Sequence, residues 1–214
     1  MVHNLGEKNS IANQYLSELR DRSIQQDRMR FRFNMQRLGR IMAVEISREL
    51  PYVTREIATP LGTKRIDIPA LQPVLVTVLR AGIPYYQGFL DVFDQAEVGF
   101  IGAGRQEGGN EITIKLDYLA TPPLTGRTLI LIDPMLATGR SFVRSVNELM
   151  KYGTPDHIYV ASLVSAPEGI QYIQQNIKTP FSIWTFALDE KLDHRFYIVP
   201  GLGDAGDLGF GEKV

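Results

Sequence analysis

Cysteine is absent from this 214-residue chain, which excludes disulfide bonds and metal sites built from thiolates. No stretch approaches the roughly 20 consecutive apolar residues of a membrane-spanning helix, and the opening residues, MVHNLGEKNS, lack the apolar core of a signal peptide. A net charge of −1 leaves no overall field that would favour nucleic acid or a membrane surface. We therefore expect a soluble cytoplasmic protein with neither partner.

With 44% hydrophobic residues the chain can bury a core, and its length fits one domain. Short apolar runs alternate with helical stretches along it. The runs expected to form strands are 74–79, 97–103, 128–133, 158–164 and 182–187, and the helices expected between them cover 83–94, 139–152 and 167–176. Strands that are apolar on both faces and alternate with helices predict an α/β fold, a mostly parallel twisted sheet with helices on both faces.

Segments outside this alternation predict two additions. Residues 52–68 read as two strands around the turn TPLG, a β-hairpin arm, and in 111–118 apolar and polar residues alternate as in a half-exposed hairpin strand. In residues 25–49 apolar side chains recur at three- and four-residue steps, which predicts a helix that Pro51 ends. We expect one domain over 1–214, with an N-terminal helical extension over 1–50.

The N-terminal extension is locally basic. A phosphate or nucleic-acid surface is one interpretation, but a solvated helix face or a subunit contact is favoured, because runs of charge usually face solvent. The arginines concerned are Arg20, Arg22, Arg28, Arg30, Arg32, Arg37 and Arg40.

Glycines near the end of the chain have the spacing of a dinucleotide-binding fingerprint, Gly201-x-Gly203-x-x-Gly206. Such a fingerprint needs a following helix and an acidic residue roughly 20 positions further on, whereas only eight residues follow Gly206. Pro200 also interrupts the preceding apolar run. The dinucleotide interpretation is excluded, and the glycines need another role.

The stretch TLILIDPMLATGRS, residues 128–141, is the most informative one. A strand ending in Asp133 leads through a short loop into a helix that begins near Gly139. Unpaired N–H groups and the partial positive charge of a helix N-terminus suit a phosphate. Thr138 and Ser141 add hydroxyl donors, and Asp133 can accept hydrogen bonds from sugar hydroxyls. The stretch predicts a sugar-phosphate site, with an ordinary strand–loop–helix capped by threonine as the alternative.

This stretch resembles the phosphoribosyl diphosphate (PRPP) signature of the type I phosphoribosyltransferases, in the Asp-Pro-Met-Leu-Ala-Thr-Gly form of the uracil phosphoribosyltransferases. VLRAGIPY (78–85) resembles the diphosphate loop of that family, and SAPEGI (165–170) with YIVPGLGDAGD (197–207) resembles its base-binding region. The match runs from about residue 28 to 207. It implies the type I phosphoribosyltransferase fold and transfer of the 5-phosphoribosyl group from PRPP to N1 of uracil, which gives UMP and diphosphate in pyrimidine salvage.

The resemblance also implies residue roles. Arg80, Arg105 and Asp133 are the expected catalytic residues, since the arginines hold the diphosphate and Asp133 holds the ribose hydroxyls. The base is gripped by the main chain within a base-binding segment at 188–214. The residues implied to bind PRPP are Arg80, Arg105, Asp133, Pro134, Met135, Leu136, Ala137, Thr138, Gly139, Arg140, Ser141 and Asp204, and those implied to bind uracil are Ile198, Gly203, Asp204 and Ala205.

The resemblance implies a cofactor and partners as well. Mg²⁺ is expected to arrive bound to the diphosphate of PRPP, without metal ligands from the protein. The expected partners are uracil, PRPP and further copies of the chain, in a homodimer or a larger homo-oligomer. Activation by a nucleotide such as GTP stays open.

Three stretches depart from the family's pattern. Arg140 stands where the family usually has glycine, and we expect its side chain to face solvent, because backbone N–H groups already serve the phosphate. The tail DLGFGEKV lacks a basic residue after GDAGD, and GRQEGGNEIT matches the family's acidic loop only weakly. Three alternatives therefore remain: a non-catalytic PRPP or nucleotide sensor, a phosphoribosyltransferase for another base, and an α/β binding module.

The three histidines show neither triad nor metal-ligand spacing. His3 lies in the terminal arm, His157 is expected in a turn, and His194 is near enough to Tyr197 to border the base pocket. Tyr197 itself is expected to pack rather than to stack on the base.

Overall fold

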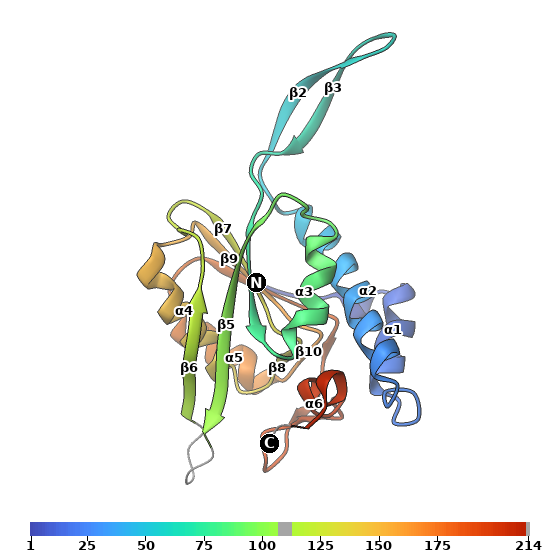
Figure 1. The fold of residues 1–214 in the computed structure, drawn as a ribbon, viewed down its shortest axis with the longest axis vertical. Coiled ribbons are helices and arrows are strands. Elements are labelled where there is room, and N and C mark those ends of the chain that lie inside the picture. The colour runs from blue at the N-terminus through green and yellow to red at the C-terminus, as the bar shows by residue number, and fades with distance from the viewer. Residues whose placement is uncertain (107–112, 213–214) are drawn as a thin grey trace.

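A seven-stranded sheet forms the centre of the molecule (Figure 1). The computed structural model describes residues 1–106 and 113–212, and side chains within 103–117 are outside that description. The strands of the sheet are β1 (Val2–Asn4), β4 (Val74–Leu79), β5 (Glu97–Gln106), β6 (Thr113–Ala120), β7 (Thr128–Ile132), β9 (His157–Ala161) and β11 (Phe181–Thr185). They lie in the order β1-β11-β9-β7-β4-β5-β6, and neighbours are parallel except that β6 is antiparallel to β5. The predicted mostly parallel sheet is confirmed.

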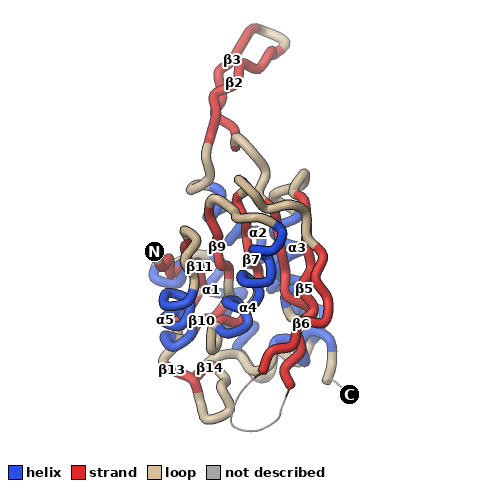
Figure 2. The backbone as a smooth tube through the Cα atoms, turned by 90° about the vertical axis from the view of Figure 1, so that its left-hand side faces the viewer, coloured by secondary structure: helices blue, strands red, loops and turns tan. Residues whose placement is uncertain are grey.

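Helices cover both faces of this sheet (Figure 2). The α-helices are α1 (Ile11–Arg20), α2 (Arg28–Ser47), α3 (Gly82–Leu90), α4 (Arg140–Leu149), α5 (Pro167–Asn176) and α6 (Ala205–Phe210), and short 3₁₀ helices are η1 (Leu5–Glu7) and η2 (Met150–Tyr152). Leu75 and Ile130 face the core formed with α1, α2 and α3, whereas Val76 and Leu131 face the core formed with α4 and α5. Because both faces are buried, the central strands are mostly apolar, as predicted, with Thr77, Ser182 and Thr185 as buried polar residues among them.

The helix expected over 25–49 is α2, and it begins later because Asp27 caps it, accepting a hydrogen bond of 3.0 Å from the N–H of Arg30. It packs closely on α3, where a Cβ on Gly39 would lie 2.1 Å from the carbonyl oxygen of Tyr85. The apolar stripe that predicted this helix is buried, namely Phe31, Met35, Leu38, Met42 and Ile46.

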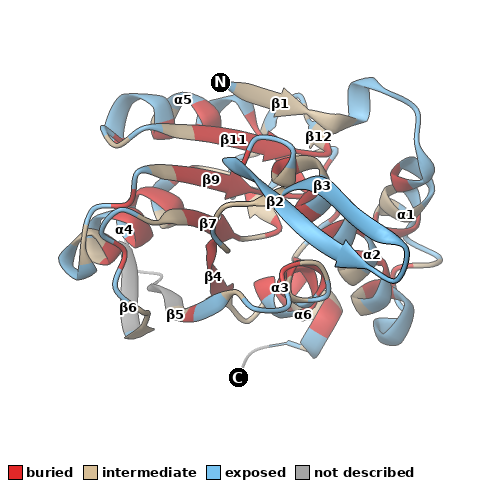
Figure 3. Cartoon of the chain, turned by 90° about the horizontal axis from the view of Figure 1, so that it is seen from above, coloured by how far each residue is buried: buried red, intermediate tan, exposed pale blue. Residues whose placement is uncertain are grey.

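The predicted hairpin arm projects from the body of the molecule (Figures 1 and 3). Its strands β2 (Tyr52–Thr59) and β3 (Gly62–Pro69) are antiparallel, and nearly every residue is exposed. Leu61 at the turn is 100% exposed. The hairpin therefore contributes nothing to the core around the central sheet.

A second, smaller layer of strands extends the central sheet. Strands β8 (Met135–Leu136), β10 (Val164–Ser165) and β12 (Ala187–Leu188) follow β7, β9 and β11 in the chain and pair in parallel, with β10 in the middle. Strands β13 (Lys191–Leu192) and β14 (Ile198–Val199) form an antiparallel pair further on. Each loop that leaves the sheet is thus tied to its neighbour.

The elements that were not predicted include one at each end of the chain. Strand β1 adds to the sheet edge beside β11, where His3 stacks on Trp184 with ring centroids 3.9 Å apart. Helix α6 forms from the glycine-rich end of the chain, and Asp204 caps it. No helix within residues 1–106 and 113–212 is long and apolar enough to cross a membrane.

Candidate active site

A cavity of about 160 Å³ opens at the carboxyl ends of β4 and β7. The chain runs from β4 to β5 on one side and later returns to β7 on the other side of β4. Neighbouring strands whose connections leave in opposite directions open a crevice beyond their carboxyl ends, where α/β proteins bind ligands. The topology alone therefore places a ligand site here.

One wall of the cavity is the loop 133–141, which we call the phosphate loop. Asp133 lies directly after β7, and its Oδ1 accepts a hydrogen bond of 3.1 Å from the N–H of Met135. Gly139 has φ 74°, and a Cβ there would meet the carbonyl oxygen of Gly169 at 2.5 Å, so the turn requires glycine. The predicted residues of this loop that line the cavity are Asp133, Met135, Ala137, Thr138, Gly139 and Ser141.

Three other residues of the predicted PRPP set do not line the cavity. Pro134 is buried, and its carbonyl oxygen accepts hydrogen bonds of 2.9 and 3.1 Å from the N–H groups of Leu163 and Val164. Leu136 is fully buried in the apolar core. Arg140 is exposed at the start of α4, outside the cavity lining, which agrees with the expected solvent-facing orientation.

Arg80 follows β4 and supplies a cation to the cavity wall. Its Nη2 donates a hydrogen bond of 3.0 Å to the carbonyl oxygen of Gly211 and lies 3.5 Å from Oδ1 of Asp207. Its Nε is buried and has no hydrogen-bond partner among the described residues, a donor that an anionic ligand can satisfy. Arg105 lies near the end of β5, and its side chain is outside the described part of the chain.

The opposite wall of the cavity is built mainly from main chain. Ile198, Gly203, Asp204 and Ala205 all line it, as predicted for the base-binding residues. Oδ1 of Asp204 accepts hydrogen bonds of 2.8 and 3.0 Å from the N–H groups that begin α6. Asp204 therefore fixes the start of this helix as well as facing the cavity.

Aromatic side chains complete this wall, and sequence reasoning missed one of them. Phe196 lines the cavity with φ 64°, in a turn whose geometry no sequence pattern indicated. Tyr197 also lines it and is 38% exposed, and its packing rather than stacking on the base stays a prediction. His194 is exposed and outside the lining. His157 begins β9 instead of lying in a turn, and its Nε2 is 3.1 Å from Oγ of Ser182.

Comparison with known proteins decides the family. The model of the family described as uracil phosphoribosyltransferase matches residues 7–211. A uracil phosphoribosyltransferase of Porphyromonas gingivalis is 42% identical over 214 residues, which are 100% of this chain and 99% of that protein. The chain belongs to the uracil phosphoribosyltransferase family.

Further relatives extend the likeness. A uracil phosphoribosyltransferase of Pyrococcus furiosus is 39% identical over 202 residues, covering 93% of this chain and 85% of the relative. The solved structure of a protein from Aquifex aeolicus has a TM-score of 0.88 at 28% identity, and the match covers 100% of both chains. The phosphoribosyltransferase-type fold implied by the resemblance is confirmed.

Carboxylates at the cavity do not gather into a metal cage. Within residues 1–106 and 113–212, no group of three or more His, Cys, Asp or Glu side chains is placed to hold a metal ion. Asp133 is followed by Pro134, so this strand end carries one carboxylate. Family membership implies Mg²⁺, and this donor set fits an ion whose remaining ligands come from substrate oxygens and water.

Proposed function

We propose that this chain transfers the 5-phosphoribosyl group from PRPP to N1 of uracil, giving UMP and diphosphate. One observation carries the proposal. A single cavity joins the N-terminus of α4, the carboxylate of Asp133, the guanidinium of Arg80 and the main chain at 203–205. These groups match, in order, a 5′-phosphate, ribose hydroxyls, a diphosphate and the edge of a base.

The phosphate loop serves the 5′-phosphate. The first N–H groups of α4 have no partner within the helix, and the helix field adds a partial positive charge there. Hydroxyl groups of Thr138 and Ser141 lie on the same wall. Asp133 accepts from the ribose hydroxyls, which fixes C1 of the sugar between the two ends of the cavity.

Arg80 acts on the leaving group. As the C1–O bond breaks, its electron pair goes to the diphosphate, and a cation beside that oxygen stabilises the developing charge. N1 of uracil then forms the new bond to C1, through a cation-like sugar, and its proton passes to the released diphosphate or to water. Arg105 has the same proposed role by resemblance. Most of the rate enhancement comes from holding the two substrates in line and away from water.

Mg²⁺ is proposed to enter with PRPP. When bound, it neutralises charge on the diphosphate. The chain supplies what the ion does not, since Arg80 offers donors to the phosphate oxygens and Asp133 holds the sugar. The proposal of a substrate-borne ion is supported by the single carboxylate at the end of β7.

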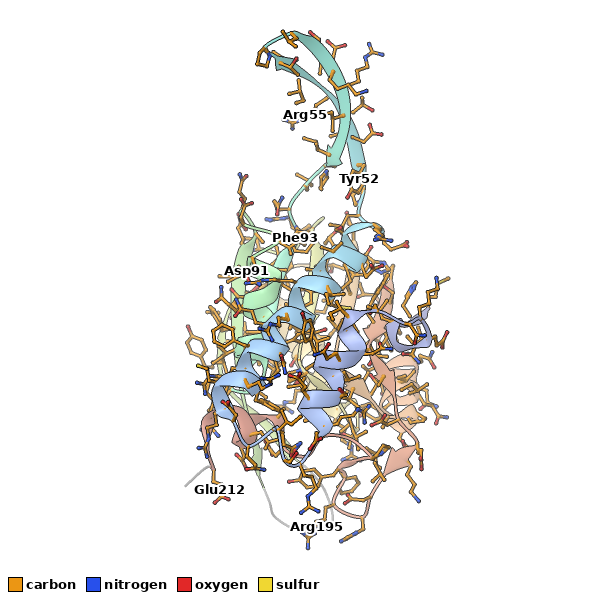
Figure 4. All side chains as sticks on the ribbon, turned by 90° about the vertical axis from the view of Figure 1, so that its right-hand side faces the viewer. Tyr52, Arg55, Asp91, Phe93, Arg195 and Glu212 are labelled. Carbon is orange, nitrogen blue, oxygen red and sulfur yellow. The ribbon has the colours of Figure 1, made fainter. Side chains whose placement is uncertain are left out.

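The exposed hairpin supports a proposed homo-oligomer, a dimer or larger. The hairpin exposes apolar side chains that nothing in the described chain covers, at Tyr52, Val53, Ile57, Leu61 and Ile66. It lies at the opposite end of the molecule from the cavity, as Arg55 and the pair Arg195 and Glu212 show (Figure 4). Light scattering should give a mass of at least two 24.1-kDa chains.

Two other expectations stay predictions. They are the division of the chain into extension, domain and base-binding segment, and the cytoplasmic location.

Incubation with PRPP, Mg²⁺ and one free base at a time tests the proposed reaction. We expect nucleotide from uracil alone, detected as UMP with stoichiometric diphosphate. Nucleotide from a different base would favour another base specificity. Saturable binding of PRPP without product would favour a sensor, the other class of function, and would contradict the proposal.

A further inference from the structure

The segment from Ile198 to Gly206, which we call the base loop, contributes Ile198 and Gly203–Gly206 to the cavity wall and is attached to the N-terminal extension. Strand β14 supplies its first residues, and α6 begins at its end. Neither element is long, so local hydrogen bonding fixes little of the loop between them. Side chains outside the loop hold this stretch: Asp189 lies 12 residues from Gly201 in the sequence, whereas Arg20 and Gln25 lie 181 and 177 residues from the backbone groups that they contact.

Both backbone polar groups of Gly201 are hydrogen-bonded to side chains. Its N–H donates a hydrogen bond of 2.8 Å to Oδ2 of Asp189, and its carbonyl oxygen accepts one of 3.0 Å from Nη1 of Arg20. Arg20 and Asp189 are themselves joined by two hydrogen bonds of 2.8 Å each. Guanidinium, carboxylate and Gly201 backbone thus form one closed set of charge-assisted hydrogen bonds.

We call this set of hydrogen bonds among Arg20, Asp189 and Gly201 the clamp. Its surroundings leave little room for another arrangement of these groups. The Asp189 side chain is only 7% exposed, and that of Arg20 is 23% exposed. The backbone of Asp189 is anchored as well, since its N–H donates to the carbonyl oxygen of Ser165 at 2.9 Å. Gly201 has φ 58°, and a Cβ there would meet the carbonyl oxygen of Ile198 at 2.1 Å.

The next residue of the base loop is held in the same way. Nε2 of the buried Gln25 donates to the carbonyl oxygen of Leu202 at 3.2 Å and to that of Leu19 at 2.9 Å. The amide therefore ties the base loop to the end of α1. Helix α1 and the turn after it meet the base loop at two consecutive residues, directly before Gly203 enters the cavity wall.

We propose that Arg20 and Asp189 are positioning residues for base recognition, which hold Gly201 so that the main chain of Gly203–Ala205 presents its groups to uracil. The inference rests on the proposed function, because it takes these residues as the base-binding ones. Neither side chain lines the cavity, so both act through the main chain. If these hydrogen bonds are weakened, part of the binding free energy of uracil is used to order the base loop, and the affinity for uracil falls. The phosphate loop is held by other contacts and is unaffected.

The first test replaces Arg20 by lysine. A lysine keeps the charge, but one ammonium group cannot make both hydrogen bonds to Asp189 and a third to Gly201. We expect the KM for uracil to rise about tenfold, the loss that follows removal of a charge-assisted hydrogen bond. We expect the KM for PRPP to stay within about twofold, because the phosphate loop is untouched.

Arg30→Lys is the matched control. Arg30 of α2 makes an equally bidentate pair with the buried Glu18 of α1, at 2.8 and 2.9 Å, and it does not contact the base loop. We expect R30K to lower the melting temperature at least as much as R20K and to leave the KM for uracil within about twofold. If Arg20 has a merely structural role, the KM for uracil should change equally in R20K and R30K. That result would overturn the proposal.

Asp189→Asn repeats the test from the other side of the clamp. It removes the charge and keeps the size, so it serves if R20K does not accumulate as folded protein, and the same selective rise in the KM for uracil is expected. A wild-type chain that forms no UMP contradicts the proposed function before any variant is compared. An active wild type with equal KM changes for uracil and PRPP in R20K or D189N contradicts the positioning role alone.

Discussion

The two walls of the cavity are built by different means. The phosphate loop runs from the end of β7 to the start of α4, so its ends belong to regular elements that are neighbours in the sequence. The base loop is held by side chains from distant parts of the chain, including Arg20, whose partner Asp189 is 169 residues away. The phosphate loop is anchored at both ends by neighbouring elements, whereas the base loop also depends on side chains of the N-terminal extension.

The two walls therefore depend on different segments of the chain. The phosphate loop needs β7, α4 and a glycine that can adopt a left-handed conformation, and these form together with the central sheet. The base loop needs the N-terminal extension to be in place. Damage to the extension should therefore weaken uracil recognition while PRPP recognition survives, whereas damage to the phosphate loop should do the opposite.

The largest expected effects come from adding one methyl group to each wall. Gly139→Ala and Gly201→Ala both place a Cβ at a left-handed φ, within 2.5 Å and 2.1 Å of a carbonyl oxygen. Such strain costs about 1–3 kcal/mol, which is roughly 5- to 150-fold in affinity. G139A should raise the KM for PRPP, and G201A the KM for uracil.

Gly126→Ala is the control for this pair. Gly126 has φ 70° and nothing within 4 Å of an added Cβ, so it carries the backbone strain without the clash. Steady-state kinetics of the three variants should show the two selective changes and none in G126A. A rise in both KM values for G139A and G201A alike would break the comparison between the walls.

The second effect concerns the sugar end of the phosphate loop. Asp133→Asn keeps the size of the side chain and removes the charge that accepts from the ribose hydroxyls. A charge-assisted hydrogen bond contributes roughly 1.5–3 kcal/mol, so we expect kcat/KM for PRPP to fall at least about tenfold in initial-rate assays. Unchanged kinetics would remove Asp133 from the proposed mechanism.

A third effect concerns the stability of the N-terminal extension. The hydrogen bonds from Arg30 and then Asn34 hold the pKa of the buried Glu18 at about 2, below its usual 4.5. Because the pKa is lower in the folded state, the stabilisation is present above pH 4.5 and is lost as the pH falls from there towards 2. Glu18→Gln should lower the free energy of unfolding at neutral pH by about 1–3 kcal/mol.

Denaturant unfolding at pH 7 and at successive lower pH values checks this. The difference between wild type and E18Q should shrink as the pH falls below 4.5. A difference that stays constant down to pH 2.5 would mean that Glu18 is not the titrating group.

The smallest expected effect is that of Arg140→Gly. Arg140 is exposed and outside the cavity lining, and an exposed charge interacts weakly through water. We expect the affinity for PRPP to stay within about twofold at two salt concentrations, measured by titration calorimetry. A gain of activity would indicate that the natural side chain blocks the site.

The wall formed by the phosphate loop is also the one that the sequence allowed us to predict. The strand expected at 74–79 is β4, and the helix expected at 167–176 is α5. Apolar runs and their period act over neighbouring residues, so they predict strand ends, and strand ends of a parallel sheet carry the ligand loops. Asp133 and Gly139 could therefore be placed at the cavity from their positions in the sequence.

The wall formed by the base loop could not be predicted in the same way. Arg20 was expected on a solvated helix face or a subunit contact, because charge patterning does not indicate which distant carboxylate an arginine meets. Helix α6 forms although four of the residues from Gly203 to Gly211 are glycine, since Asp204 caps it and Arg32 donates a hydrogen bond of 2.8 Å to the carbonyl oxygen of Gly209. Phe196 enters the cavity through a positive φ that its sequence neighbours do not require.

The second layer of strands sets a length scale for the ligand. Strand β8 belongs to the phosphate loop, β12 leads into the base-binding segment, whose first residue is Leu188, and β10 lies between them. Neighbouring strands lie about 4.8 Å apart, so two steps fix a spacing of roughly 10 Å across this layer. The small sheet therefore fixes the distance between the phosphate loop and the chain that enters the base-binding segment.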